Sequence, residues 1–346
     1  MPSQPTDMKE QSPPGPNGRW PADASRWLFF VCLLGVMAGQ AGMSGAESVP
    51  AAQDNGVLRL GFTSGVFMGV NENDAKAAMK IWGQTIAKEH GVTVVAEPTV
   101  LNGPEAIISA IQKSLVDAFT ITVVEYWAMG GQGLSTNTVL GVNNGVATED
   151  YVVLVHRDSN FGRIEDLRGH SLNFFQNVRN SLAPIWFETL LLQSGLGTTD
   201  KFCGRVTQAT KLSQAVLPVF FRQTDACVVT RRGFQTMIEL NPQVGQRLKT
   251  LATSPALIPV VFAFREAYSS PVKGQIMAEI QKVHFTASGQ QVLTLFQSDS
   301  LEVRPVSALA PALELLETHA RLCKATNATD TAGTNLAPAP AKAGGP

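Results

Sequence analysis

The chain has 346 residues, of which 44% are hydrophobic and 16% are charged, and its formal net charge is -1. This length allows about two domains. The apolar fraction excludes wholesale disorder, and the near-zero net charge excludes a protein held to nucleic acid by bulk electrostatics. The four cysteines contain no C-x-x-C pair, which argues against a zinc ribbon or a thioredoxin-type redox centre.

Residues 1–46 are predicted to be an export segment outside the fold. A Pro- and Gly-rich stretch leads to the apolar run 27–38, which has arginines on its N-terminal side and small residues after it. This is the layout of a secretory signal. The uncharged stretch 27–46 is close to the length of a membrane span, so an uncleaved N-terminal membrane anchor is the alternative.

The stretch 57–145 alternates strand and helix patterns. Short apolar, β-branched runs predict strands at 57–62, 92–96 and 118–124, the last one running on into Glu125. Apolar residues at i, i+3, i+4 spacing predict helices at 73–89 and 104–114. This alternation is typical of a parallel sheet with helices on both faces, and we take it as the first part of one lobe.

A second such unit occupies residues 146–255. Strands are predicted at 151–156, 171–174 and 225–230, and helices at 184–193 and 211–222, the latter kinked by Pro218. Residues 256–324 return to the first lobe with an extended stretch and C-terminal helices, and 325–346 are typical of a disordered tail. The predicted fold class is α/β, with two lobes that each contain a mostly parallel sheet flanked by helices.

Sequence motifs for catalysis and for metal binding are missing from the chain. It contains no G-x-S-x-G, H-E-x-x-H, Walker loop or complete G-x-G-x-x-G. The five histidines lie far apart, without the spacing of a metal site. We therefore expect no enzyme activity, no cofactor and no metal.

Polar loops at the carboxyl ends of predicted strands are the candidate binding residues, because ligands of open α/β sheets bind at that edge. Thr63 and Ser64 follow the first strand, where a plain turn is the alternative. The loop 176–181 precedes a helix, so Asn180 or Ser181 is either an N-cap or an anion-binding group. Arg179 in this loop is unfavourable for the helix dipole unless an anion lies between them; its alternatives are solvent exposure or a pair with a carboxylate such as Glu188. The adjacent Arg231 and Arg232 follow the strand that ends at 229–230, where one of them could reach the cleft; a solvated face is the favoured alternative.

Several segments resemble the type II periplasmic solute-binding proteins of ABC importers, in particular the phosphate/phosphonate/phosphite-binding family. They are residues 125–128 after the third strand, the turn 164–170 after the strand at 149–155, and the return segment 253–259. The resemblance covers residues 57–309. It implies a monomeric periplasmic substrate-binding component of an ABC transporter, with an inner-membrane permease as partner and no nucleic acid. It further implies that Tyr126 faces a small anionic ligand in a cleft between the lobes.

The ligand loop departs from the family pattern. Residues 177–181 keep one serine and gain Arg179, and the position of the family's ligand-facing histidine holds Ser213, whereas Asp225 matches. The resemblance therefore implies phosphate, phosphite or a phosphonate, with a carboxylate or zwitterion as alternative. The predicted ligand-binding residues are Thr63, Ser64, Tyr126, Asn177, Arg179, Asn180, Ser181, Ser213 and Asp225.

Two further alternatives follow. A ligand-sensing periplasmic protein that signals to a membrane receptor fits the same fold, and so does an enzyme built on it. Because an exported chain enters an oxidising compartment, Cys203 and Cys227 are a candidate disulfide.

Overall fold

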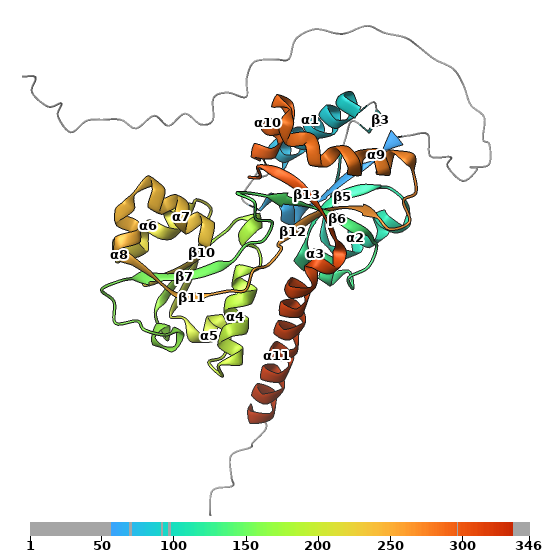
Figure 1. Ribbon diagram of the computed structural model, residues 1–346. Coiled ribbons are helices and arrows are strands. Elements are labelled where there is room, and N and C mark those ends of the chain that lie inside the picture. The colour runs from blue at the N-terminus through green and yellow to red at the C-terminus, as the bar shows by residue number, and fades with distance from the viewer. Residues whose placement is uncertain (1–56, 69–70, 91–92, 96–97, 296, 335–346) are drawn as a thin grey trace, which may run out of the picture. The chain divides into compact units, whose positions relative to one another are not determined.

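The computed structural model describes residues 57–68, 71–90, 93–95, 98–295 and 297–334 (Figure 1). The predicted export segment, 1–46, and the last part of the predicted tail lie outside the described residues. No helix within these ranges is both long and apolar enough to cross a membrane.

One sheet has six strands in the order β13-β6-β12-β5-β2-β4. Its strands are β2 (Leu60–Thr63), β4 (Thr99–Leu101), β5 (Ala118–Thr122), β6 (Leu134–Val142), β12 (Val260–Arg265) and β13 (Ser300–Pro305). Strand β2 pairs parallel with β4 and β5, whereas β12 is antiparallel to β5 and β6, and β13 is antiparallel to β6. The sheet is therefore mixed, and the returning strand β12 lies inside it.

Helices of the same region precede, follow or connect these strands. They are α1 (Glu72–His90), α2 (Gly103–Gln112), α3 (Val123–Ala128), α9 (Pro271–Glu279) and α10 (Ala287–Leu295), with the 3₁₀ turns η1 (Ser64–Phe67), η4 (Ile280–Phe285) and η5 (Val306–Leu309). Strands β1 (Val57–Leu58) and β3 (Thr93–Val94) form a separate parallel pair. Residues 123–128 are helical, and not a continuation of the strand as the sequence suggested, because Thr122 and Glu125 form a capping box that starts α3.

A second sheet has five strands in the order β11-β7-β10-β8-β9. They are β7 (Tyr151–His156), β8 (Ser171–Phe175), β9 (Arg205–Ala209), β10 (Ala226–Thr230) and β11 (Leu248–Thr253). The connecting elements are η2 (Ile164–Leu167), η3 (Val178–Asn180), α4 (Ala183–Gln193), α5 (Thr199–Phe202), α6 (Leu212–Phe220), α7 (Arg231–Leu240) and α8 (Pro242–Arg247). Strand β8 is parallel to β9 and β10, whereas β7 runs antiparallel to β10 and β11.

The core of the five-stranded sheet explains why β7 is apolar throughout. Every residue of β7 is buried. Val153 and Val155 belong to one core cluster, which includes Phe187 of α4, while Val152 and Leu154 belong to another, which includes Val216 of α6. Successive side chains of a strand point to opposite faces, so helices on both faces require a continuous apolar run.

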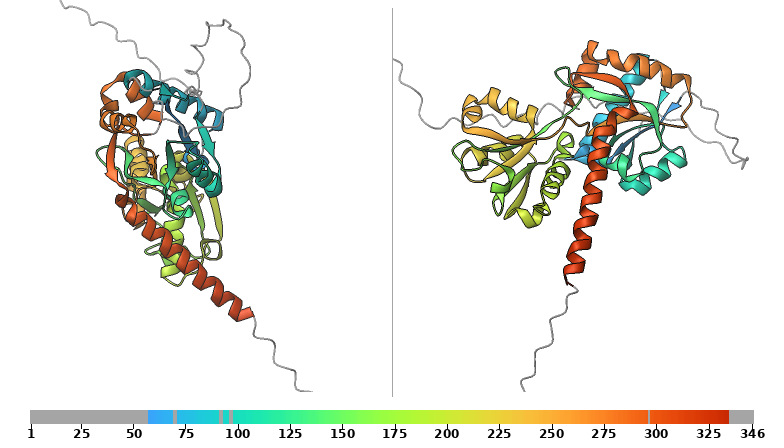
Figure 2. Two further views of the ribbon diagram at one scale, coloured as in Figure 1. Left: turned by 90° about the vertical axis from the view of Figure 1, so that its right-hand side faces the viewer. Right: turned by 60° about the horizontal axis from the view of Figure 1, so that its bottom comes forward.

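Helix α11 (Ala310–Thr334) follows β13 through η5 and packs against α4 (Figures 1 and 2). Its apolar residues Ala312 and Leu316 share a core cluster with Trp186 and Phe187 of α4. The helix continues to Thr334, past residue 325, where the sequence predicts the tail to begin. Once a helix is nucleated, each added residue gains a hydrogen bond without a new nucleation cost.

The chain passes from the six-stranded to the five-stranded sheet after β6 and returns after β11. The two passing segments are hydrogen-bonded to one another. Glu149 N donates to Leu257 O at 2.7 Å, and Leu257 N donates to Glu149 O at 2.8 Å. We refer to these two segments, residues 143–150 and 254–259, as the crossing ribbon.

Candidate functional site

The carboxyl end of β2 places Thr63 beside the carboxylate of Glu125. Thr63 is fully buried, and its hydroxyl donates to Glu125 Oε2, as the Thr122 hydroxyl also does at 2.7 Å. Gly65 N donates to Glu125 Oε1 at 3.3 Å, and a Cβ at Gly65 would lie 2.8 Å from that same oxygen. The polar donors at this edge are therefore already bonded to an internal carboxylate, while Ser64 is exposed.

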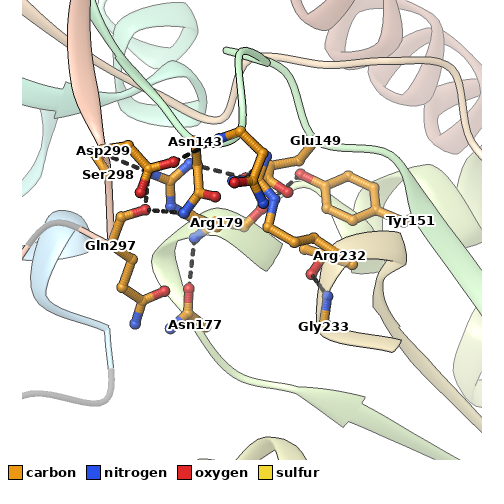
Figure 3. Close-up of polar contacts among 12 residues, drawn as sticks. Asn143, Glu149, Tyr151, Asn177, Arg179, Arg232, Gly233, Gln297, Ser298 and Asp299 are labelled. Carbon is orange, nitrogen blue, oxygen red and sulfur yellow. Dashed lines mark hydrogen bonds and ion pairs between the residues drawn. The ribbon is translucent and has the colours of Figure 1, made fainter. Parts of the chain in front are cut away.

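Arg179 is buried and bonded to protein groups (Figure 3). Its Nη1 donates to Glu149 Oε1 at 2.9 Å, and its Nη2 donates to Ser298 Oγ and to the Gln297 carbonyl, each at 2.8 Å. Of the alternatives given from the sequence, the pair with a carboxylate is the one observed, but the partner is Glu149 and not Glu188. The guanidinium links the loop after β8 to the crossing ribbon and to the segment before β13. These internal hydrogen bonds use the N–H groups that the predicted anion contact requires.

Glu149 lies between two arginines. Its side chain is 2% exposed, and Arg232 Nη2 lies 3.6 Å from the same Oε1 that Arg179 contacts (Figure 3). Tyr151 lies beside this cluster, and its hydroxyl donates to the Arg179 carbonyl at 3.0 Å. Burial, together with the Glu149 charge, raises the pKa of the Tyr151 hydroxyl. Two guanidinium groups thus face one carboxylate beside the carboxyl end of β10.

The predicted loop 177–181 has both satisfied and unsatisfied polar groups. Asn177 Oδ1 accepts from Arg179 N at 2.9 Å, and Asn180 Nδ2 donates to the Phe175 carbonyl at 2.6 Å, so both amides shape the loop. By contrast, Asn180 Oδ1 and Ser181 Oγ are buried with no hydrogen-bond partner among the described residues. Arg232 Nη1 is in the same condition. Buried polar atoms without a partner are costly and uncommon.

These unsatisfied groups lie at one edge of one sheet. Strands β8 and β10 are parallel neighbours, so the loop after β8, which holds Ser181, and the start of α7, which holds Arg232, follow adjacent strand ends. The 3₁₀ turn η1 of the other sheet contacts η3 of this loop. The structure thus brings together two of the predicted loops, 63–65 and 177–181. It adds Glu125 and Glu149, which were not singled out from the sequence, and Arg232, for which a cleft position was the less favoured alternative.

Tyr126 lies in the core with 5% exposure, and its hydroxyl donates to the Gly131 carbonyl at 2.5 Å. Burial and, secondarily, Glu266 raise the pKa of this hydroxyl. A ligand contact through this group would have to replace its bond to Gly131. Ser213 is the second residue of α6 and is half-buried.

Asp225 is separated from the loop 177–181. It precedes β10 and accepts from Ser171 N at 2.9 Å and from Ser171 Oγ at 2.6 Å, at the start of β8. Because β8 and β10 are parallel, both groups lie at the amino edge, about five residues or ~16 Å along the strands from the loop after β8. The structure therefore does not bring Asp225 together with the predicted ligand loop.

The described thiols and one cavity lie elsewhere. Within the described part of the chain, Cys203, Cys227 and Cys323 are free, so the candidate disulfide is not formed, and burial raises the pKa of Cys203 to about 11. A cavity of about 440 Å³ lies beside β6, β13 and α9 and is lined by Asn137, Tyr268 and Lys273 among others. None of the predicted ligand-binding residues lines it.

Comparisons with known proteins agree with this architecture. Residues 65–307 match the family model described as ABC transporter, phosphonate, periplasmic substrate-binding protein. No curated protein matches the chain. At 13–16% identity, the solved structures below show likeness of fold alone.

The binding protein component of an ABC phosphonate transporter from Pseudomonas aeruginosa superposes with a TM-score of 0.53 at 16% identity, covering 80% of this chain and 90% of its own. A Prochlorococcus marinus protein in complex with methylphosphonate gives a TM-score of 0.52 at 13% identity, covering 75% and 97%. A Xanthomonas citri protein bound to ATP gives 0.53 at 14% identity, covering 78% and 99%.

The family match spans well over half of the chain and runs through both sheets and the crossing ribbon. The mixed α/β sheets are those of type II periplasmic binding proteins. The chain therefore belongs to the periplasmic substrate-binding proteins of ABC phosphonate transporters, a family of transport proteins.

Proposed function

We propose that this protein captures a small oxyanion, such as phosphate, phosphite or a phosphonate, at the carboxyl edge of the five-stranded sheet. One observation carries the proposal: the Ser181 hydroxyl and Arg232 Nη1 are buried donors with no partner among the residues described. An oxyanion supplies several acceptor oxygens, and a guanidinium with a hydroxyl is a combination that binds one.

The charge of the site supports an anion. Glu149 is shared by Arg179 and Arg232, so one positive charge is not matched within that cluster. The neighbouring Arg231 is paired separately with Asp150 and adds no net charge. An anionic group at Ser181 and Arg232 would balance the excess and satisfy the unpaired donors together.

The wider proposal concerns export and delivery. We infer that residues 1–46 are a cleaved signal, and that segments 57–145 and 256–324 form one lobe and 146–255 the other. The lobes would close over the ligand and present a surface to an inner-membrane permease, with the protein acting as a monomer. The Prochlorococcus relative was solved with methylphosphonate and the Xanthomonas relative with ATP, and both ligands contain phosphorus-bound oxyanions.

The test is calorimetric titration with inorganic phosphate, phosphite, methylphosphonate and acetate. We expect at least one phosphorus oxyanion to bind, and Arg232→Gln to weaken that binding about 10- to 150-fold, the effect of a lost charge-assisted hydrogen bond. Arg205→Gln is the matched control, since Arg205 is exposed and starts β9 at the amino edge of the same sheet. Failure of every phosphorus oxyanion to bind, or equal affinity of the two variants, would reject the proposal.

A zwitterionic ligand is the second candidate, and Glu125 is the observation that favours it. Its carboxylate is half-buried, and among the described residues Oε1 accepts one hydrogen bond, from Gly65 N. An oxygen of a carboxylate can accept two, which leaves a position for a ligand ammonium group. If so, 2-aminoethylphosphonate should bind more tightly than ethylphosphonate, and Glu125→Gln should remove that difference. Equal affinities in the parent protein would leave the simple anion as the ligand class.

A further inference from the structure

Three side chains that can bind metal meet where α4 packs on α11, away from the strand-end loops. Glu188 projects from α4, and His319 and Cys323 project from α11. The distances are 3.2 Å between His319 Nε2 and Glu188 Oε1, 3.5 Å between Cys323 Sγ and His319 Nε2, and 3.9 Å between Cys323 Sγ and Glu188 Oε1. One nitrogen, one sulfur and one oxygen thus form a small triangle.

The size of this triangle fits one face of a zinc tetrahedron. Zinc bond lengths of about 2.3 Å to sulfur and about 2.0–2.2 Å to nitrogen and oxygen give tetrahedral edges of about 3.6 Å for S–N, 3.4 Å for N–O and 3.6 Å for S–O. The observed separations depart from these edges by about 0.1–0.3 Å, so a cation could bind all three atoms with very small side-chain shifts.

The fold holds the three groups in place. His319 and Cys323 are four residues apart, so they are stacked on one face of α11. The second carboxylate oxygen of Glu188, Oε2, accepts from the backbone N–H of Thr199 at 3.0 Å, at the start of α5. A hydrogen bond of this kind fixes the orientation of a metal ligand, and it directs Oε1 toward the other two atoms. Glu188 and His319 are about one-quarter exposed, which leaves a path for an ion from solvent.

We propose that Glu188, His319 and Cys323 form a Zn²⁺ site with three protein ligands and a fourth position open to water. Thiolate, imidazole and carboxylate together suit zinc, whereas Mg²⁺ and Ca²⁺ take oxygen ligands only. On binding, the Cys323 thiol proton passes to solvent and the thiolate coordinates the metal. The proposal does not depend on the anion site.

The site would have a structural consequence. Helix α4 begins at Ala183, two residues after Ser181, and α11 extends from the β13 end of the six-stranded sheet. A zinc ion bound to both helices fastens the helix that follows the ligand loop to the C-terminal helix. We expect zinc to raise the melting temperature of the metal-free protein, because a ligand that binds only the folded state stabilises it.

The first experiment uses untagged full-length protein, stripped with a chelator and titrated with Zn²⁺ against a chromophoric chelator. We expect one tight zinc per chain. Substituting Co²⁺ should give intense tetrahedral d–d bands and a thiolate-to-cobalt charge-transfer band. Absence of tight binding, or a cobalt spectrum without the thiolate band, overturns the proposal.

Variants assign the site to these residues. Cys323→Ser, His319→Gln and Glu188→Gln should each weaken zinc binding by about 100-fold, as loss of one of three ligands implies. The control is Cys203→Ala, which removes a buried thiol just before β9. If the control weakens binding as much as the three variants do, or if the three variants bind like the parent, the assignment is wrong.

Alkylation of the parent protein gives a readout that needs no variant. Cys323 is partly exposed, whereas Cys203 and Cys227 are buried, so an alkylating reagent should modify Cys323 before these two in the metal-free folded protein. Stoichiometric zinc should slow that modification at least about tenfold. Equal rates at Cys323 with and without zinc, measured by mass spectrometry of peptides, contradict coordination by its sulfur.

Discussion

The carboxyl edges of the two sheets differ in whether their hydrogen-bond donors already have partners. At the six-stranded sheet, Thr63, Gly65 and Thr122 already donate to the carboxylate of Glu125. At the five-stranded sheet, Ser181 and Arg232 keep buried donors without a partner in the described structure. Both edges hold an internal carboxylate, Glu125 or Glu149, and the two unpartnered donors at the second edge are the ones that we propose for the external anion.

This difference teaches that an arginine beside a strand end is not sufficient evidence of an anion site. Arg179 and Arg232 flank the same Glu149. Arg179 donates hydrogen bonds to Glu149, Ser298 and Gln297, whereas Nη1 of Arg232 has no partner among the described residues. The distinction depends on partners from distant parts of the chain.

The largest expected effect comes from breaking the Arg179 contacts. Arg179→Met should lower the free energy of unfolding by about 3–5 kcal/mol, because it leaves the buried Glu149 charge without its closest partner. Urea unfolding of the ligand-free protein measures this. The double variant Arg179→Met/Glu149→Gln should recover part of the loss. A single variant as stable as the parent would return Arg179 to the list of ligand contacts.

The next effect concerns the internal anion. Glu125→Gln should lower the free energy of unfolding by about 1–3 kcal/mol, since an amide nitrogen replaces an acceptor that faces the Thr63 and Thr122 hydroxyls. Glu314→Gln, at an exposed position of α11, is the matched control. Equal stability of the two variants would mean that the carboxylate is not needed at this edge.

A smaller effect distinguishes the Ser181 hydroxyl, at the five-stranded sheet, from the Thr63 hydroxyl, at the six-stranded sheet. Ser181→Ala should weaken oxyanion binding about 2- to 12-fold, the effect of one neutral hydrogen bond, without lowering stability, because the hydroxyl has no partner in the described structure. Thr63→Val should do the reverse, lowering stability and leaving affinity unchanged. Calorimetric titration and thermal melting of both variants check this, and identical behaviour would remove the contrast between the edges.

The smallest effect extends the comparison to the amino edge of the five-stranded sheet. Burial raises the pKa of Asp225, but hydrogen bonds from Ser171 and the nearby His170 outweigh it, so the pKa lies below its ordinary value. Because the folded pKa is lower than the unfolded one, this contribution to stability is present above about pH 4 and is lost as the pH falls through the folded pKa.

Asp225→Asn should accordingly flatten the dependence of the unfolding midpoint on pH between about pH 5 and 3. The difference from the parent will be modest, since the side chain is 39% exposed and solvent screens its interactions. Parallel curves for the two proteins would show that the Ser171 contacts do not stabilise the ionised form.

Much of the fold could be predicted from local patterns. Strands β7 and β10 and helix α4 have long apolar runs that allow no other reading, and their observed bounds lie within one residue of those expected. Strands β6 and β9 were not predicted because polar residues interrupt them. Strand β9 is mostly exposed, and β6 contains an exposed polar pair at 136–137. A pattern of alternating burial is weak where the strand lies near an edge.

The site was less predictable for physical reasons. The capping box of Thr122 and Glu125 is a local signal that the sequence contains. The partner of Arg179 is 30 residues away, and no local rule selects Glu149. Likewise His319 and Cys323 have a readable four-residue spacing, but Glu188 is 131 residues from His319. The expectation of no metal rested on the missing C-x-x-C and H-E-x-x-H motifs and on the spacing of the histidines, and none of these detects a ligand that a distant helix contributes.

The crossing ribbon has a mechanical consequence. The two crossing segments are linked at Glu149 and Leu257 by a reciprocal pair of backbone hydrogen bonds. We expect bending of one sheet against the other to occur about an axis through this pair. Since Glu149 also contacts Arg179 and Arg232, the same residue that defines this axis is joined to both loops that follow β8 and β10, so the flexing point and the charge cluster are one structural unit.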